Sequence, residues 1–358
     1  MMNDAAPLEV ALICFPYYPS KDTGRGHDRY VYELAENLKK SSPVLSVSVI
    51  EQGFSKGLSA AFGKLSKLAR DLLTSRAKVF HAITPMGGAA AILAGKRNVV
   101  VTIHDLIPFH HSSYDYSWKY KYVRACTRLC ARRAAAVIVP YRVTRDEVIQ
   151  SLKGAPERVH VVNYGVDHAT YFPRAELSRL PRRVLYIGEV SRSKGVDVLI
   201  RAFHQVKASV PDAELVIGGK TNRDQPALEE LARSLGVNGI TFKGFIPEEE
   251  LATYYATTTL MVFPSRYGFG LSVLEAMACG TPVVAAAALD APEFVADAGL
   301  LVDPDDVAGL GDCIRRVLTE PALRAELAEK GVERARRFSW QNMADGTRAI
   351  YEQVARSK

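Results

Sequence analysis

The sequence of 358 residues contains only five cysteines. No two of them have the spacing of metal ligands, and an odd number argues against a disulfide framework. Cys126 and Cys130 are four residues apart on an expected helix, where small apolar packing is their more common role. We therefore expect the cysteines to be structural, with no metal site built on them.

Long apolar runs are also absent. A membrane-spanning helix needs about 20 apolar residues, and the nearest run, Ala89–Ile103, is interrupted by Lys96 and Arg97. The run Val10–Phe15 lacks the basic start and the length of a secretory signal. These absences predict a cytoplasmic protein.

Two common nucleotide-site signatures are missing as well. Asp303, Asp305 and Asp306 stand beside a proline, so we expect them to cap the next helix and not to hold a divalent cation. No GxGxxG string follows the first expected strand with an acidic residue about 20 positions later, which counts against a dehydrogenase. The sequence therefore predicts no cofactor and no bound metal.

Short apolar runs alternate with helical patterns along the whole chain, which is the rhythm of βαβ units. A chain of this length, with 48% hydrophobic residues, is too long for one core. We expect an α/β protein with domains over 1–168 and 169–340 and a C-terminal helix over 341–358. The expected strands are Val10–Phe15, Leu45–Ile50, Val79–Ala82, Val99–Ile103, Ala136–Val139, Val184–Ile187, Ala213–Ile217, Ile240–Phe242, Leu260–Phe263 and Val283–Ala286.

Residues 262–284, VFPSRYGFGLSVLEAMACGTPVV, contain the most specific pattern in the chain. A buried strand is broken by Pro264, Gly268 and Gly270, and helical spacing resumes from Leu271. The unpaired N–H groups and the dipole at the start of such a helix favour a phosphate, and glycines allow close approach. One turn later, Glu275 can accept two hydrogen bonds from a vicinal diol. The segment therefore predicts a nucleotide-sugar site.

This segment resembles the donor-site signature of retaining glycosyltransferases of family four, which is usually close to PSxxEGFGxPxLEAMAxGxPV. Tyr267 stands where the first carboxylate of that pattern falls. The resemblance implies two facing Rossmann-like domains of the GT-B type, with an inter-domain cleft and a C-terminal helix that crosses back to the N-terminal domain. The first domain is then expected to bind the acceptor and the second the donor. The expected donor-binding residues are Gly26, Gly219, Lys220, Phe245, Tyr267, Gly268, Phe269, Gly270, Leu271 and Glu275.

Two cations follow the first expected strand of the second half, in YIGEVSRSKG. Arg192 and Lys194 can neutralise a diphosphate and stabilise the departing nucleotide. Lys194 matches the lysine of the family pattern, whereas Glu189 replaces its arginine, so Arg192 has to supply the second charge. The alternative is a solvated basic loop.

His104 stands at the carboxyl end of the apolar strand in VVVTIHDLIPF. In an α/β sheet this end faces the ligand cleft. The resemblance implies that His104 contacts the donor sugar and stabilises the transition state, and that it is not a metal ligand. In DTGRGHDRY, only Gly26 and the pair Arg29–Tyr30 match the glycine-rich loop of the family.

The net charge of +7 is concentrated in residues 1–170, which hold 23 Lys plus Arg against 14 Asp plus Glu. Two amphipathic stretches, 57–76 and 118–133, carry cations beside apolar or aromatic residues. We expect them to dock on anionic lipid headgroups, although a solvated charged face explains them nearly as well. No nucleic-acid-binding motif accompanies the charge. In 57–76 the apolar stripe is Leu58, Phe62, Leu65, Ala69 and Leu72, with Lys64, Lys67 and Arg70 off it. In 118–133 four cations are expected to share one face, flanked by Trp118, Tyr120 and Tyr122: Lys121, Arg124, Arg128 and Arg132.

The sequence thus predicts a retaining, metal-independent glycosyltransferase. HDLIP and GFIPEEEL are similar to strings in bacterial mannosyltransferases of surface polysaccharide assembly, so the expected donor is GDP-mannose and the expected acceptor a glycan or polyprenyl-linked glycan. One alternative is a nucleotide-sugar epimerase on the same scaffold, since a fold does not fix a function. Another is a non-catalytic binding protein derived from a transferase, suggested by Tyr267 and Glu189.

Overall fold

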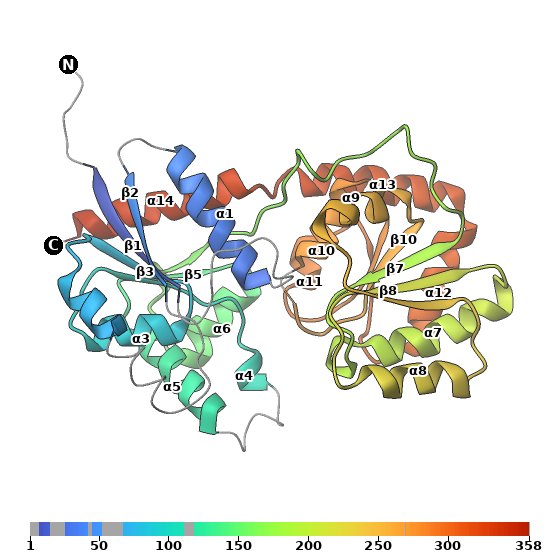
Figure 1. The fold of residues 1–358 in the computed structure, drawn as a ribbon, viewed down its shortest axis with the longest axis horizontal. Coiled ribbons are helices and arrows are strands. Elements are labelled where there is room, and N and C mark those ends of the chain that lie inside the picture. Colours follow the sequence, from blue (N-terminus) through green and yellow to red (C-terminus); the bar gives the residue numbers. More distant parts are fainter. Residues whose placement is uncertain are drawn as a thin grey trace. The chain divides into compact units, whose positions relative to one another are not determined.

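The computed structural model describes residues 7–14, 26–41, 45–51, 67–110, 118–268 and 270–357 (Figure 1). Its contacts divide the chain into two compact units. The first combines Met1–Tyr164 with Trp340–Lys358, and the second is Gly165–Ser339. The division therefore falls after Tyr164 and not at residue 168, and the C-terminal segment of the first unit starts at Trp340.

The first unit is built on a parallel sheet of six strands in the order β2-β1-β3-β4-β5-β6. All four residues of β3, β4 and β5 are buried, which explains why parallel strands appear in the sequence as continuous apolar runs. The strands are β1 (Leu8–Cys14), β2 (Leu45–Glu51), β3 (Val79–Ala82), β4 (Val99–Thr102), β5 (Ala136–Val139) and β6 (Val159–Val161).

Helices cover both faces of this sheet. In Figure 1, α1 and α14 lie on one face, and α3, α5 and α6 lie on the other. Thr84 caps α3 by accepting a hydrogen bond from the N–H of Gly87, which satisfies one of the unpaired donors at the helix start. The helices are α1 (Gly26–Ser41), α3 (Pro85–Leu93), α4 (Ile107–His110), α5 (Trp118–Arg133), α6 (Arg142–Leu152), the 3₁₀ turn η2 (Pro156–Arg158) and α14 (Trp340–Arg356).

The second unit repeats the architecture with a parallel sheet in the order β12-β11-β10-β7-β8-β9. Its strands are β7 (Arg183–Ile187), β8 (Glu214–Gly218), β9 (Ile240–Gly244), β10 (Leu260–Phe263), β11 (Val283–Ala286) and β12 (Leu300–Val302). Its helices are the 3₁₀ turn η3 (Arg192–Lys194), α7 (Val196–Ser209), α8 (Gln225–Ser234), α9 (Glu248–Thr257), α10 (Leu271–Ala278), α11 (Ala291–Val295), α12 (Val307–Thr319) and α13 (Pro321–Ala335). The predicted α/β class with two Rossmann-like domains is confirmed.

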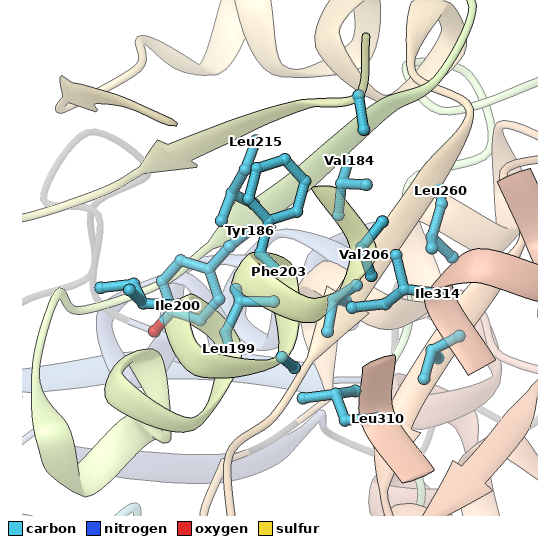
Figure 2. Packing of buried hydrophobic residues seen from close by; sticks show 14 of the residues in the cluster. Val184, Tyr186, Leu199, Ile200, Phe203, Val206, Leu215, Leu260, Leu310 and Ile314 are labelled. Carbon is cyan, nitrogen blue, oxygen red and sulfur yellow. The ribbon is translucent and has the colours of Figure 1, made fainter. Parts of the chain in front are cut away.

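One core cluster of the second unit joins the sheet to helices α7 and α12 (Figure 2). Phe203 of α7 and Ile314 of α12 are completely buried in it, together with Leu215 of β8. Truncating a buried phenylalanine to alanine costs about 3–5 kcal/mol. This core holds the strands in place and therefore fixes where the loops after them begin.

Several smaller expectations can be compared with the structure. Asp306 caps α12 by accepting a hydrogen bond from the N–H of Gly309 at 2.8 Å, as predicted. Of the stripe proposed for 57–76, Leu72 is buried as predicted, but Ala69 is exposed and its neighbour Leu68 is buried in its place. The rest of that stripe lies outside the described residues. All five cysteines are free. No helix in the described ranges is both long and apolar enough to cross a bilayer.

Candidate functional site

Except for Gly26, which begins α1 of the first unit, the predicted donor residues lie after neighbouring strands of the second unit. Because the strands are parallel, their carboxyl ends share one edge of the sheet. Gly188 follows β7, Lys220 lies just after β8, and Phe245 follows β9. The loop that begins with Pro264 and Ser265, the proline–serine loop, follows β10. The edge therefore gathers loops that are separated by up to about 80 residues in the sequence.

The loop after β7 contacts the loop after β10. The Lys194 ammonium donates a hydrogen bond to the carbonyl oxygen of Tyr267 at 2.8 Å. Ser265 braces the same residue, since its hydroxyl donates to the Tyr267 carbonyl and accepts from the Tyr267 N–H. The structure thus brings two predicted site residues, Lys194 and Tyr267, into direct contact.

Gly195 explains how closely these two loops pack. Its φ of +73° lies in the left-handed region that favours glycine. A Cβ atom there would stand 2.3 Å from the carbonyl oxygen of Pro264. Lys194 is therefore held next to Tyr267 by a backbone approach that no other residue type permits without a shift.

Helix α10 begins beside this contact. Gly270, with a φ of +73°, occupies its N-cap position, and a Cβ atom on it would lie 2.8 Å from the ring of Phe294. Gly268 and Leu271 flank this N-cap in the chain, whereas Phe269 lies outside the described residues. The first N–H groups of α10 have no partner within the helix, and with the helix dipole they form a favourable position for an anion.

The loops after β7 and β8 are joined by backbone contacts. The N–H of Val190 donates to the Lys220 carbonyl at 3.1 Å. At Gly219, φ is +132° and a Cβ atom would lie only 1.8 Å from the Gly188 carbonyl oxygen. Lys220 is exposed, and so is the Phe245 ring, at 56%. An exposed aromatic ring at this edge can stack on a planar base.

The loop that carries Glu189 and Arg192 is held by polar contacts that the sequence did not indicate. The backbone N–H of Arg192 donates to Asp224 Oδ2 at 3.1 Å, and its side chain is exposed. The Glu189 carboxylate accepts a hydrogen bond from the Asn222 amide. Asn222 and Asp224, which the sequence did not single out, therefore hold the loop that carries the cations.

Glu275 lies in the second turn of α10 and is 6% exposed. The hydroxyl of Tyr255 in α9 donates to Glu275 Oε2 at 3.0 Å. Burial and the neighbouring Glu275 charge raise the pKa of Tyr255 well above its ordinary value, so Tyr255 stays a donor. No sequence signal pointed to Tyr255.

His104 of the first unit is buried in the loop after β4, with 5% exposure. Its Nε2 lies 3.0 Å from the Ile83 carbonyl oxygen, and its Nδ1 lies 2.7 Å from the Tyr164 hydroxyl. A carbonyl can only accept, so Nε2 carries the proton and Tyr164 donates to Nδ1. Burial, followed by the neighbouring His27, lowers the pKa of His104 well below its ordinary value. The ring is neutral and fixed in one tautomer.

Gly26 is the first residue of α1, and two later residues of this helix contact His104. The rings of His27 and Tyr30, both in α1, meet the His104 ring edge-on, with centroids 4.6 Å and 4.8 Å away. Of the glycine-rich loop, only the residues from Gly26 onward are described. The start of α1 therefore forms one wall around His104.

Comparisons with known proteins identify the family. Residues 23–170 match the profile described as Glycosyltransferase Family 4, and residues 181–320 match Glycosyl transferases group 1. A D-inositol 3-phosphate glycosyltransferase from Nocardioides sp. is 30% identical over 367 residues, which covers 91% of this chain and 80% of that protein. The chain belongs to glycosyltransferase family 4.

Other relatives of this glycosyltransferase differ in what they act on. An Escherichia coli O-antigen chain mannosyltransferase B is 28% identical over 269 residues, covering 71% of this chain and 70% of that protein. A sucrose-phosphate synthase from Thermosynechococcus elongatus superposes with a TM-score of 0.84 at 24% identity, over 98% of this chain and 100% of that chain. The structure of Anabaena HepE in complex with UDP and glucose superposes with a TM-score of 0.79 at 21% identity, over 97% of this chain and 100% of that chain. These two structures support the fold.

The basic helix α5 of the glycosyltransferase differs from its predicted form. Arg124 donates to the Pro108 carbonyl and Arg132 to the Leu152 carbonyl, so the predicted shared face of four cations is partly used to hold loops. Arg128 is exposed and lies over the Phe109 ring, 5.1 Å from its centroid. Trp118 and Tyr122 are exposed, at 80% and 47%, and Lys119 and Lys121 lie between them.

A buried polar chain in the first unit of the glycosyltransferase was not predicted. His81 Nδ1 lies 2.6 Å from the Tyr351 hydroxyl and His81 Nε2 lies 2.8 Å from Thr102 Oγ1. Thr102 also bonds the Tyr30 hydroxyl at 3.1 Å. The chain links α14, β3, β4 and α1. Two of its directly bonded residues, His81 and Tyr351, are 270 residues apart in sequence, which explains why no local pattern indicated it.

Proposed function

We propose that this glycosyltransferase transfers a hexose, with mannose as the first candidate, from a nucleoside diphosphate sugar to a glycan or lipid-linked glycan. The observation that supports it best is the contact of Lys194 with the Tyr267 carbonyl beside the N-terminus of α10. A cation and a helix start in one place suit a diphosphate. The mannosyl specificity is supported by the similarity to an O-antigen mannosyltransferase.

Each group at the sheet edge has a proposed role. Lys194 and Arg192 neutralise the diphosphate, the exposed Phe245 stacks on the base, and Glu275 accepts hydrogen bonds from a sugar diol. Lys220 and the glycines from Gly219 to Gly270 shape the rim around the donor. Since fixed cations and the α10 dipole can carry the diphosphate charge, we propose that the reaction requires no metal. Among the residues that the structure describes, no three His, Cys, Asp or Glu side chains gather as ligands of a metal ion.

We propose that the anomeric configuration is retained. The bond between the anomeric carbon and the phosphate oxygen breaks through an oxocarbenium-like state, and its electron pair leaves with the diphosphate. The acceptor oxygen bonds to the same face of the anomeric carbon, and its proton passes to the departing phosphate oxygen. His104 is the proposed contact to the donor sugar, through its backbone, because both of its ring nitrogens already bond Ile83 and Tyr164.

The first unit is the proposed acceptor side. Exposed Trp118 and Tyr122, with Lys119 and Lys121, combine an aromatic surface with positive charge. Such a surface suits the anionic headgroups of a membrane that carries a lipid-linked acceptor. We propose peripheral docking at the cytoplasmic face through α5; the first half of the predicted stretch 57–76 lies outside the described residues.

Donor turnover tests this function. Purified protein is incubated with GDP-mannose, UDP-glucose and ADP-glucose and a polyprenyl-linked acceptor, in EDTA and in magnesium, and nucleoside diphosphate release and the product's anomeric configuration are measured. We expect one donor to be consumed equally in both buffers with retention. An inverted product, or turnover only with magnesium, would contradict the proposed mechanism.

Tyr267 replaces the first carboxylate of the family's donor-site pattern. This replacement favours a second candidate, a non-catalytic nucleotide-sugar-binding protein. It differs from the first in one respect, because the donor would bind without being consumed. Saturable donor binding with no turnover, over several acceptors, would support this second function.

A further inference from the structure

Glu275 is an unusual residue for its place in the fold. Helix α10 is otherwise apolar inside, and Val273, Leu274 and Met277 on either side of Glu275 are completely buried. Burying a carboxylate costs free energy unless hydrogen bonds compensate for the lost water. Tyr255 supplies such a bond, with its hydroxyl 3.0 Å from Oε2.

Tyr255 is itself rigidly held. The residue is completely buried in α9, and its ring meets the Tyr171 ring edge-on with centroids 5.9 Å apart. Its carbonyl accepts a hydrogen bond from the Thr281 hydroxyl at 2.6 Å, which ties α9 to the segment that follows α10. A phenol has one proton to donate, and here a fixed ring directs that proton at one carboxylate oxygen.

We propose that Tyr255 is a positioning residue, which orients the Glu275 carboxylate to receive the ribose diol of the donor nucleotide. This inference rests on the proposed function and makes it more specific. Glutamate has three rotatable side-chain bonds, and the hydrogen bond to Oε2 selects one orientation of the carboxylate before the nucleotide arrives. Preorganisation of this kind raises affinity because less freedom is lost on binding. Tyr255 itself does not touch the nucleotide.

A purely structural role predicts a different result. If Tyr255 only fills the core, its hydroxyl affects the stability of the second unit and affects every ligand equally. If it acts through Glu275, its loss affects only ligands that carry the ribose hydroxyls. The two roles can therefore be separated by removing hydroxyls from the ligand as well as from the protein.

The experiment is a binding comparison by calorimetry. GDP, UDP, ADP and their 2′,3′-dideoxy forms are titrated into the full-length wild type, Tyr255→Phe, Glu275→Gln and the double variant. Tyr255→Phe keeps the ring and removes one oxygen, and Glu275→Gln keeps the side-chain volume, so both are the mildest changes available. Thermal unfolding without ligand reports whether each variant is folded.

We expect Tyr255→Phe to weaken binding of the preferred ribonucleotide about tenfold, as for one hydrogen bond to a charged group. Its effect on the dideoxy nucleotide should be less than twofold. In the Glu275→Gln background, Tyr255→Phe should have little further effect, because both changes act through one carboxylate.

Equal losses for ribo and dideoxy nucleotides would overturn the inference in favour of a core-filling tyrosine. No loss for either would also overturn it. Additive losses in the double variant would show that Tyr255 does not act through Glu275. If the wild type binds none of these nucleotides, the proposed function itself fails, and that outcome is distinct from all the others.

Discussion

Lys194 is the residue on which the proposed donor site depends most. It is held by Gly195 against the proline–serine loop and bonds the Tyr267 carbonyl. Removing a fixed positive group that stabilises a departing phosphate typically lowers turnover by 10²–10³. We expect Lys194→Ala to lower kcat/KM at least about 100-fold in the donor-turnover assay, with an unchanged thermal unfolding temperature.

Lys330→Ala is the matched control for this substitution. Lys330 lies on α13 of the same unit, is partly exposed and pairs with Glu326 at 2.8 Å. Its removal should leave turnover within about twofold, because exposed ion pairs contribute little. Turnover at the wild-type rate by Lys194→Ala would show that Lys194 is not part of the donor site.

Gly195 gives a prediction about stability at the same place. Gly236 has a similar φ, +64° against +73°, but no atom lies within 4 Å of a Cβ atom built on it. Gly236→Ala should therefore cost about 1 kcal/mol, the usual strain of the left-handed region. Gly195→Ala adds the contact with the Pro264 carbonyl, so we expect at least about 2 kcal/mol more in urea unfolding. An equal loss of unfolding free energy in Gly195→Ala and Gly236→Ala would contradict the close approach of Gly195 to the Pro264 carbonyl.

His81 predicts how the first unit responds to acid. Burial lowers its pKa to about 3, from an ordinary value of 6.5. The folded state therefore favours the neutral ring, and this stabilisation is fully present above pH 6.5 and is lost as pH falls toward 3. The loss reaches about 1.4 kcal/mol per pH unit. We expect His81→Gln to be less stable than wild type at pH 7, with a difference that shrinks by pH 5 in thermal unfolding; parallel curves would contradict the assignment.

At the scale of elements, α5 carries the proposed docking surface. Lys119 and Lys121 are exposed beside Trp118, and each cation near an anionic membrane contributes about 1 kcal/mol. Reversing both charges to glutamate should weaken binding to phosphatidylglycerol vesicles at least about tenfold and leave nucleotide binding unchanged.

The control for this surface is the same double reversal at Arg233 and Arg336, which are exposed cations of the second unit. That variant should bind vesicles as the wild type does. Unchanged vesicle affinity in the α5 variant would show that these lysines form an ordinary solvated face.

The sequence predicted the elements well where one physical signal dominates. Strands such as β4 and β10 are buried on both faces, so continuous apolar runs located them. Glycines marked the start of α10 in the sequence. The structure shows why glycine is needed there, since Gly270 has a positive φ and lies against the Phe294 ring. The prediction failed for Ala69, because spacing alone does not determine which side of a short amphipathic helix meets the core.

The site was predicted only as far as its motifs extend. Lys194, Tyr267 and Glu275 lie in strings that indicate a phosphate site, and the first two do meet. Tyr255 and Asn222 were missed, because each acts through a tertiary contact with a residue 20 or more positions away. Such partners carry no local pattern, and only the fold reveals them.

At the scale of the whole molecule, much of the basic composition serves to hold the fold. Many arginines donate to backbone carbonyls and thereby hold loops and helix ends, as when Arg179 bonds the carbonyls of Thr258, Cys279 and Gly280. Six further arginines also donate to backbone carbonyls: Arg124, Arg132, Arg145, Arg158, Arg324 and Arg334. These arginines keep their positive charge, but their guanidinium groups are already engaged, so the net charge of +7 overstates the number of cations available for direct contact with a partner.

We propose that the second unit binds a nucleoside diphosphate through Lys194 and the start of α10, without a metal. The most direct test is thermal unfolding of the wild type and Lys194→Ala with GDP, UDP, ADP and their sugar conjugates, in EDTA and in magnesium. We predict that one nucleotide selectively raises the wild-type unfolding temperature, equally in both buffers, and that Lys194→Ala loses most of this shift. No shift with any nucleotide, or a shift that appears only with magnesium, would contradict the claim.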